Sequence, residues 1–184
     1  MSKLFDHKKT LQAIGVIAKA HGNRIGAMRL LKILYITDRE LLAQTARTLT
    51  NDRPVAMENG PVLSRTYDFI KQEATDSIFW QEYVRKDGYM VELLLDPGIG
   101  KLSKLELLKL REVCERYHGM DDWDLSKLTH HFAEWSDVYP ADGTKTSVNI
   151  NWATALRSMG REELIPEFDA ETAVKQSLDS LYGR

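Results

Sequence analysis

The stretch Met28–Gln44, MRLLKILYITDRELLAQ, decides the fold of this chain. In its first nine residues, only Arg29 and Lys32 interrupt the run of apolar side chains. A surface helix keeps one polar face, so a helix that is apolar nearly all round is expected to be enclosed by other elements. We therefore predict a central, buried helix over about residues 26–47.

Capping and turn signals predict the elements around this helix. Ser103 and Glu106 have the spacing of a capping box at a helix start. Asp87-Gly88 predicts a two-residue hairpin turn that would place Val84 opposite Val91. Pro61 suits the first position of a helix. The helices are expected at 6–20, 26–47, 62–71, 103–119, 124–135, 151–159 and 169–181, with a β-hairpin over 80–95. This is a mainly α (α+β) fold: one domain over residues 1–184, built around the buried helix, with one small antiparallel hairpin.

Composition narrows the function classes. The chain has 25 basic and 27 acidic residues, a formal net charge of −2, without the basic excess typical of nucleic-acid binding. Its single cysteine, Cys114, excludes an intrachain disulfide framework and a cysteine-rich zinc site. The sequence shows neither an apolar signal region nor an apolar run long enough to span a bilayer. We expect a cytoplasmic protein with no membrane partner.

Asp38 is the least expected residue of the central helix, because it lies on an apolar stripe. A buried carboxylate without a partner costs several kcal/mol. A cationic or backbone N–H partner is therefore nearly obligatory, and we predict a structural, buried role for Asp38, with Arg24 and Arg65 as the candidate cations. Catalysis is disfavoured, because no second carboxylate has the spacing of an acid–base pair.

The sequence assembles no catalytic or metal site. His130 and His131 are adjacent on a predicted helix and point about 100° apart, so one metal ion would not easily bind both. Zinc-site and serine-hydrolase motifs are missing, including around Ser64. We expect no metal, no cofactor and no enzymatic activity, although an enzyme using His130 with Asp38 remains an alternative.

Arg29, Lys32 and Arg39 recur at helical spacing on the central helix. They form either a solvated face with extended side chains or a recognition surface for an acidic partner.

Several short motifs occur in a characteristic order. They are LLKxLY at 30–35, Asp38-Arg39, Asp52-x-Pro54, Asn59-Gly60-Pro61-Val62, and Leu128-Thr129-His130 followed by Trp135. In this order they resemble the Panacea domain family, the SocA-like proteins often encoded in phage and prophage neighbourhoods. The resemblance is strongest over residues 25–140.

The resemblance implies an antitoxin of a toxin–antitoxin system. Such a protein neutralises a cognate toxin, usually the product of an adjacent gene, by direct protein–protein binding. One alternative is an adaptor that delivers the toxin to a protease. Another is a small DNA-binding regulator, although the charge balance makes a nucleic-acid partner unlikely.

We expect the partner to bind around the stiff Pro54–Pro61 segment. Interface energy usually concentrates in a few aromatic and arginine residues, so Arg39 and Trp135 are the expected anchors. Charge reversal at Arg39 should then abolish binding and leave unfolding near native. The predicted contact residues are Arg39, Asn59, Gly60, Pro61, Ser64, His130 and Trp135.

Overall fold

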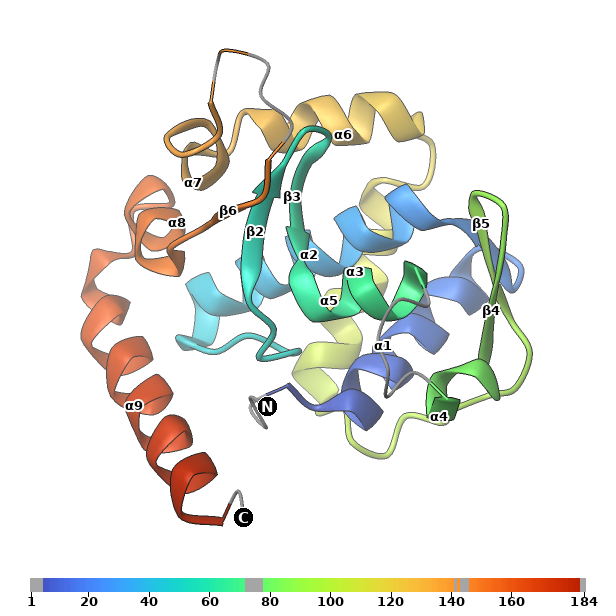
Figure 1. Ribbon diagram of the computed structural model, residues 1–184, viewed down its shortest axis with the longest axis horizontal. Coiled ribbons are helices and arrows are strands. Elements are labelled where there is room, and N and C mark those ends of the chain that lie inside the picture. The colour runs from blue at the N-terminus through green and yellow to red at the C-terminus, as the bar shows by residue number, and fades with distance from the viewer. Residues whose placement is uncertain (1–4, 72–77, 141, 143–145, 183–184) are drawn as a thin grey trace.

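Helix α2 (Ala27–Thr45) runs through the middle of the molecule, as predicted (Figure 1). The computed structural model describes residues 5–71, 78–140, 142 and 146–182. Twelve residues of α2 are buried, and the helices that pack against it include α1 (His7–Ala20), α3 (Ser64–Lys71), α5 (Lys104–Arg116), α6 (Asp122–His130) and α8 (Trp152–Ser158). The prediction of an enclosed central helix is confirmed.

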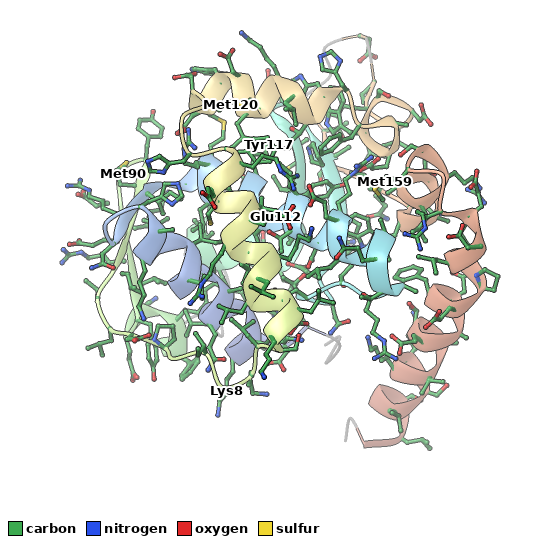
Figure 2. All side chains as sticks on the ribbon, turned by 180° about the vertical axis from the view of Figure 1, so that it is seen from behind. Lys8, Met90, Glu112, Tyr117, Met120 and Met159 are labelled. Carbon is green, nitrogen blue, oxygen red and sulfur yellow. The ribbon has the colours of Figure 1, made fainter. Side chains whose placement is uncertain are left out.

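Local capping sets the starts of α1 and α5. The Asp6 side chain accepts a hydrogen bond from the Lys9 amide at 3.0 Å, and Ser103 and Glu106 form the complete capping box. Helix α5 then crosses the back of the molecule, with Glu112 on it and Tyr117 at its end (Figure 2).

The predicted hairpin is present, but its register was predicted wrongly. Strands β4 (Val84–Asp87) and β5 (Met90–Leu93) pair with Val84 opposite Leu93. The turn residues are therefore 88 and 89, because Gly88, with φ of 58°, takes the first turn position. A third strand, β1 (Arg24–Gly26), was not predicted; it extends the sheet in the order β1-β5-β4.

A second three-stranded sheet shows that the prediction of only one β element is wrong. Strands β2 (Pro54–Met57) and β3 (Gly60–Leu63) form another hairpin, and β6 (Val148–Asn149) pairs with β2. Pro61 therefore lies in a strand rather than at a helix start. Helix α3 (Ser64–Lys71) follows β3 directly.

The second half of the chain also departs from the predicted helix boundaries. The helix expected over 124–135 is two helices, α6 and α7 (Ala133–Ser136), because Phe132 adopts an extended backbone conformation between them. After α8 come a short 3-10 helix, η1 (Glu162–Leu164), and the long helix α9 (Ile165–Tyr182), which lies along one edge of the molecule (Figure 1).

The helices dominate the architecture and the two small sheets are both antiparallel, so the mainly α fold class with a small β part is confirmed. Within the described residues, none of the helices is both long and apolar enough to cross a membrane.

Candidate functional site

The turn between β2 and β3 is held by side chains from three helices. Each donates a hydrogen bond to a backbone carbonyl of the hairpin end, so these carbonyls do not need water as their partner. The three bonds are Lys32 to Pro61 (2.8 Å), Ser126 to Asn59 (2.7 Å) and Trp135 to Met57 (2.9 Å). The turn is therefore fixed to α2, α6 and α7.

Gly60 lies where three of the sequence motifs meet. Its φ is +94°, a conformation that side chains with a Cβ rarely adopt. A Cβ built there would lie 2.4 Å from Thr129 Oγ1 and 2.9 Å from Lys32 Nζ. Lys32 of the LLKxLY motif, Gly60 of the Asn-Gly-Pro motif and Thr129 of the Leu-Thr-His motif thus pack so closely together that position 60 must be glycine.

His130 and Trp135 stack beside this turn. Their ring centroids are 4.2 Å apart and the rings are almost parallel. Burial, and after it the positive charge of Lys32, lowers the pKa of His130. His131 caps the end of α6 and is exposed. Among the described residues, no three His, Cys, Asp or Glu side chains gather in a way that could hold a metal ion.

Arg39 forms a buried ion pair with Glu134. Its Nε lies 2.6 Å from Glu134 Oε1, and its guanidinium lies 4.1 Å from the centre of the Phe132 ring. The Tyr35 hydroxyl donates a further hydrogen bond to Glu134 at 3.2 Å. The Glu134 side chain is fully buried and that of Arg39 is 15% exposed. For the charge reversal at Arg39, this geometry predicts a loss of stability, the opposite of our expectation from sequence.

The basic stripe on α2 is neither a solvated face nor an open recognition surface. Arg29 and Lys32 are both buried. The Arg29 guanidinium pairs with Asp122 at 2.6 Å and donates to the Tyr117 carbonyl at 2.9 Å. Arg29 thus joins α2 to α6 and to the end of α5, and both readings of the stripe are wrong.

Asp38 is fully buried, and backbone N–H groups, one of the two expected kinds of partner, bind its carboxylate. Its carboxylate accepts hydrogen bonds from the amides of Leu49 (2.7 Å) and Thr50 (3.2 Å) and from the Thr50 hydroxyl. Arg24 pairs instead with Asp87. Burial outweighs these donors and raises the pKa of Asp38 to about 7. Asp38 thus holds the chain that follows α2.

Asp52 is a buried residue whose role sequence reasoning missed. It accepts from the amides of Arg65 (3.0 Å) and Thr66 (2.8 Å) and from the Thr66 hydroxyl, so it caps the start of α3 from across the hairpin. Burial raises its pKa. The Asp52-x-Pro54 motif was the one sequence signal for this residue, and it did not identify the distant partner.

Few of the predicted contact residues are freely accessible. Asn59 is exposed; Arg39, Ser64, His130 and Trp135 are half-buried; Gly60 and Pro61 are buried.

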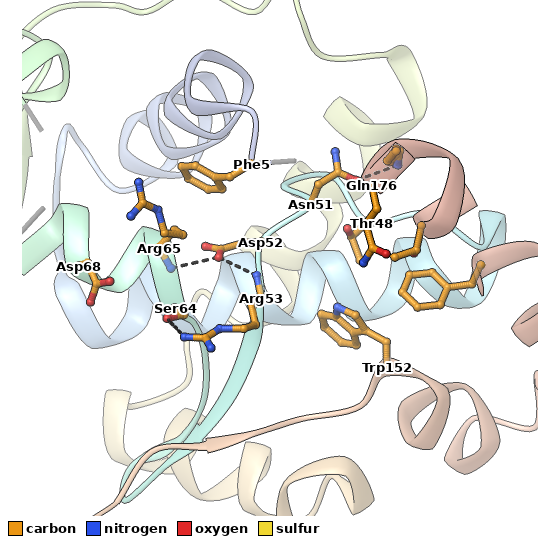
Figure 3. Close-up of a pocket in the computed structure, with 13 residues that line it drawn as sticks. Phe5, Thr48, Asn51, Asp52, Arg53, Ser64, Arg65, Asp68, Trp152 and Gln176 are labelled. Atoms are coloured by element: carbon orange, nitrogen blue, oxygen red, sulfur yellow. Dashed lines mark hydrogen bonds between the residues drawn. The ribbon is translucent and has the colours of Figure 1, made fainter. Parts of the chain in front are cut away.

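Three of the predicted contact residues line hollows beside the β2–β3 hairpin. Ser64 lines a cleft of about 600 Å³, the α9 cleft, between the body of the domain and α9 (Figure 3). Asn59 and Gly60 line a pocket of about 370 Å³, the turn pocket. The α9 cleft is lined by Phe5, Thr48, Asn51, Asp52, Arg53, Ser64, Arg65, Asp68, Trp152, Phe168, Thr172, Lys175 and Gln176.

The α9 cleft combines aromatic walls with a polar rim. Trp152 and Phe168 lie on one side of it. Arg53 is exposed and donates to the Ser64 hydroxyl at 3.2 Å, while Lys175 on α9 donates to Asn51 at 2.9 Å. Aromatic and arginine side chains at a concave surface are typical of protein–protein contacts.

Comparison with known proteins agrees with this arrangement of motifs. Searches of curated proteins and of solved structures gave no match. The family model described as "Antitoxin SocA-like, Panacea domain" matches residues 30–136, which contain the turn and the side chains that hold it. Since this match covers more than half of the chain, the protein belongs to the SocA-like Panacea domain family.

Proposed function

We propose that this protein is an antitoxin that neutralises a partner toxin by binding it directly. The observation that carries the proposal is the family match over residues 30–136, whose description names an antitoxin-like domain. We further propose that the protein acts without catalysis, in the cytoplasm, and that the toxin is the product of an adjacent gene.

The α9 cleft is the contact surface that we propose. It is the larger of the two hollows beside the hairpin. Its lining includes aromatic side chains and the exposed Arg53, which can serve as anchors in place of Arg39 and Trp135. Those two predicted anchors are committed to internal contacts with Glu134 and the Met57 carbonyl. Ser64 keeps its predicted place in the contact, at the rim of the cleft.

Growth rescue tests the proposal. The toxin is expressed from an inducible promoter with and without this protein, and the complex is then sought by pulldown. Rescue together with a stoichiometric complex is the expected result. Rescue without any complex would refute neutralisation by binding.

Two neighbouring residues on α9 provide a matched pair of variants for the contact surface. Thr172 lines the cleft, whereas Ala173 is exposed on another side of the helix. Thr172→Arg should obstruct the cleft and abolish rescue, and Ala173→Arg should rescue as the wild type does. Arg53→Glu, at an exposed position, should also reduce rescue. Equal rescue by all three variants would place the contact elsewhere.

The alternatives give different results in the same cells. An adaptor would lower the level of the toxin, and only where the protease is present, whereas a masking antitoxin leaves that level unchanged. A DNA-binding regulator would form a specific complex with its operator without toxin, and this complex would weaken steeply with salt.

A further inference from the structure

In the part of the chain that the structure describes, Lys32 is a buried charge without a counter-charge. It is 1% exposed, and its ammonium donates to the Pro61 carbonyl at 2.8 Å. An ammonium has three N–H donors and needs an anion or several acceptors when it is buried. Among the described residues, no carboxylate lies within ion-pair distance of Lys32. Burial accordingly lowers the pKa of Lys32 to about 7.

Other buried cations of the fold do have such partners. Lys109 lies 3.2 Å from Glu40 and also contacts Glu112, and Arg39 has Glu134. This contrast makes Lys32 the place where an external anion would complete a pair.

Lys32 lines the turn pocket. The pocket is lined by residues of α2, the β2–β3 turn, α3 and the tip of the β4–β5 hairpin. Gly60 belongs to the same wall, and the Lys32 ammonium lies directly beside it. Most of the remaining lining is apolar and includes Met28, Leu31 and Val62.

The charge around the turn pocket is positive. Of the described residues that line it, Lys86 is exposed and adds its charge to that of Lys32, and the acidic residue is Glu58.

We propose that the turn pocket binds a small amphipathic carboxylate. Its aliphatic or aryl group would occupy the apolar floor, and its carboxylate would lie against the lysines. A volume of about 370 Å³, a mainly apolar lining and a few charged groups are the usual properties of a small-molecule site. A single carboxylate matches the buried ammonium of Lys32 and the rim ammonium of Lys86, while the apolar lining disfavours a more heavily charged phosphate. This site is separate from the α9 cleft and requires no toxin.

Titration of the isotope-labelled full chain with 4-phenylbutyrate tests the proposal, and the uncharged 4-phenylbutyramide is the matched probe. Backbone amide shifts should change in a saturable way at Asn59, Gly60 and Gly88, which line the pocket. The acid should bind about tenfold more tightly than the amide, as expected for a charge-assisted contact.

Variants separate the charges from the shape of the pocket. Lys32→Met keeps the length of the side chain and should weaken the acid about tenfold without weakening the amide. Lys86→Glu, at an exposed position, should weaken the acid several-fold, and it decides the question if Lys32→Met does not fold. Lys104→Glu, exposed on α5, is the control and should bind as the wild type does.

Three outcomes would overturn the proposal: equal binding of acid and amide, unchanged acid binding by Lys86→Glu, or shifts that cluster in the α9 cleft. Failure of this titration would leave the growth-rescue result intact, because the probe and the toxin are assigned to different hollows.

Discussion

Breaking the Arg39–Glu134 pair is the sharpest test of how the interior is built. Replacing Arg39 with Met removes the cation and leaves the fully buried Glu134 with the Tyr35 hydroxyl. Removing one partner of a buried ion pair typically costs about 3–5 kcal/mol. The Arg39 side chain is 15% exposed, so water screens part of the interaction, and we expect the lower end, about 3 kcal/mol.

Urea unfolding followed by circular dichroism measures this cost, and thermal unfolding gives a second estimate. For a chain of this size, each kcal/mol corresponds to roughly 2–4 °C, so Arg39→Met should lower the Tm by about 6–12 °C. Arg39→Glu should lower it further, because it places a second carboxylate beside Glu134. The urea m-value should stay unchanged if the folded state keeps its compactness.

A double-mutant cycle provides the control. Glu134→Gln removes the charge and keeps a hydrogen-bond acceptor for Tyr35. If the pair is coupled as the structure shows, the double variant should be more stable than the two single losses imply, by about 2 kcal/mol. A loss of less than about 0.5 kcal/mol in Arg39→Met, the size usual for surface substitutions, would refute a buried pair.

Two further predictions concern the turn. Gly60→Ala should destabilise the fold by about 2–4 kcal/mol in urea unfolding, because it combines a positive φ with a clash against Thr129; a variant within about 0.5 kcal/mol of the wild type would show that the turn relaxes freely. The second prediction concerns Lys32 and the pH dependence of stability. Burial lowers the pKa of Lys32 in the folded state from 10.5 to about 7. Between these pH values the unfolded chain binds more protons than the folded chain, so stability rises with pH. Relative to Lys32→Met, the wild type should gain about 2 kcal/mol between pH 7 and 9, and parallel pH profiles would contradict the lowered pKa.

Features that depend on nearby residues could be predicted from the sequence. The apolar run from Leu30 to Ile36 gave the central helix, because its composition allows no solvent face. Asp6 and the Ser103–Glu106 box gave helix starts, because a cap and its amide are three residues apart.

Features that depend on distant pairing could not be predicted in the same way. Glu134 lies 95 residues from Arg39, and the sequence predicted one continuous helix over 124–135 around it. The break at Phe132 separates α6 from α7, and Glu134 lies in the buried part of α7. Asp52 similarly caps α3 although it precedes the whole β2–β3 hairpin in the sequence. The local sequence around Pro61 does not show this distant cap and instead suggested that a helix starts at Pro61.

This division has a consequence for where a partner can bind. The contacts of the motif residues Lys32, Gly60 and Thr129 fix the turn, so they specify the fold rather than the contact with a toxin. The α9 cleft, in contrast, has one wall within residues 30–136 and another on α9, beyond that range. If the cleft is the contact surface, then the choice of toxin depends on a helix that the family match does not include. Exchanging side chains on the cleft-facing side of α9, as at Thr172, should therefore change partner binding while the urea midpoint stays constant, whereas a change at Gly60 should lower both together.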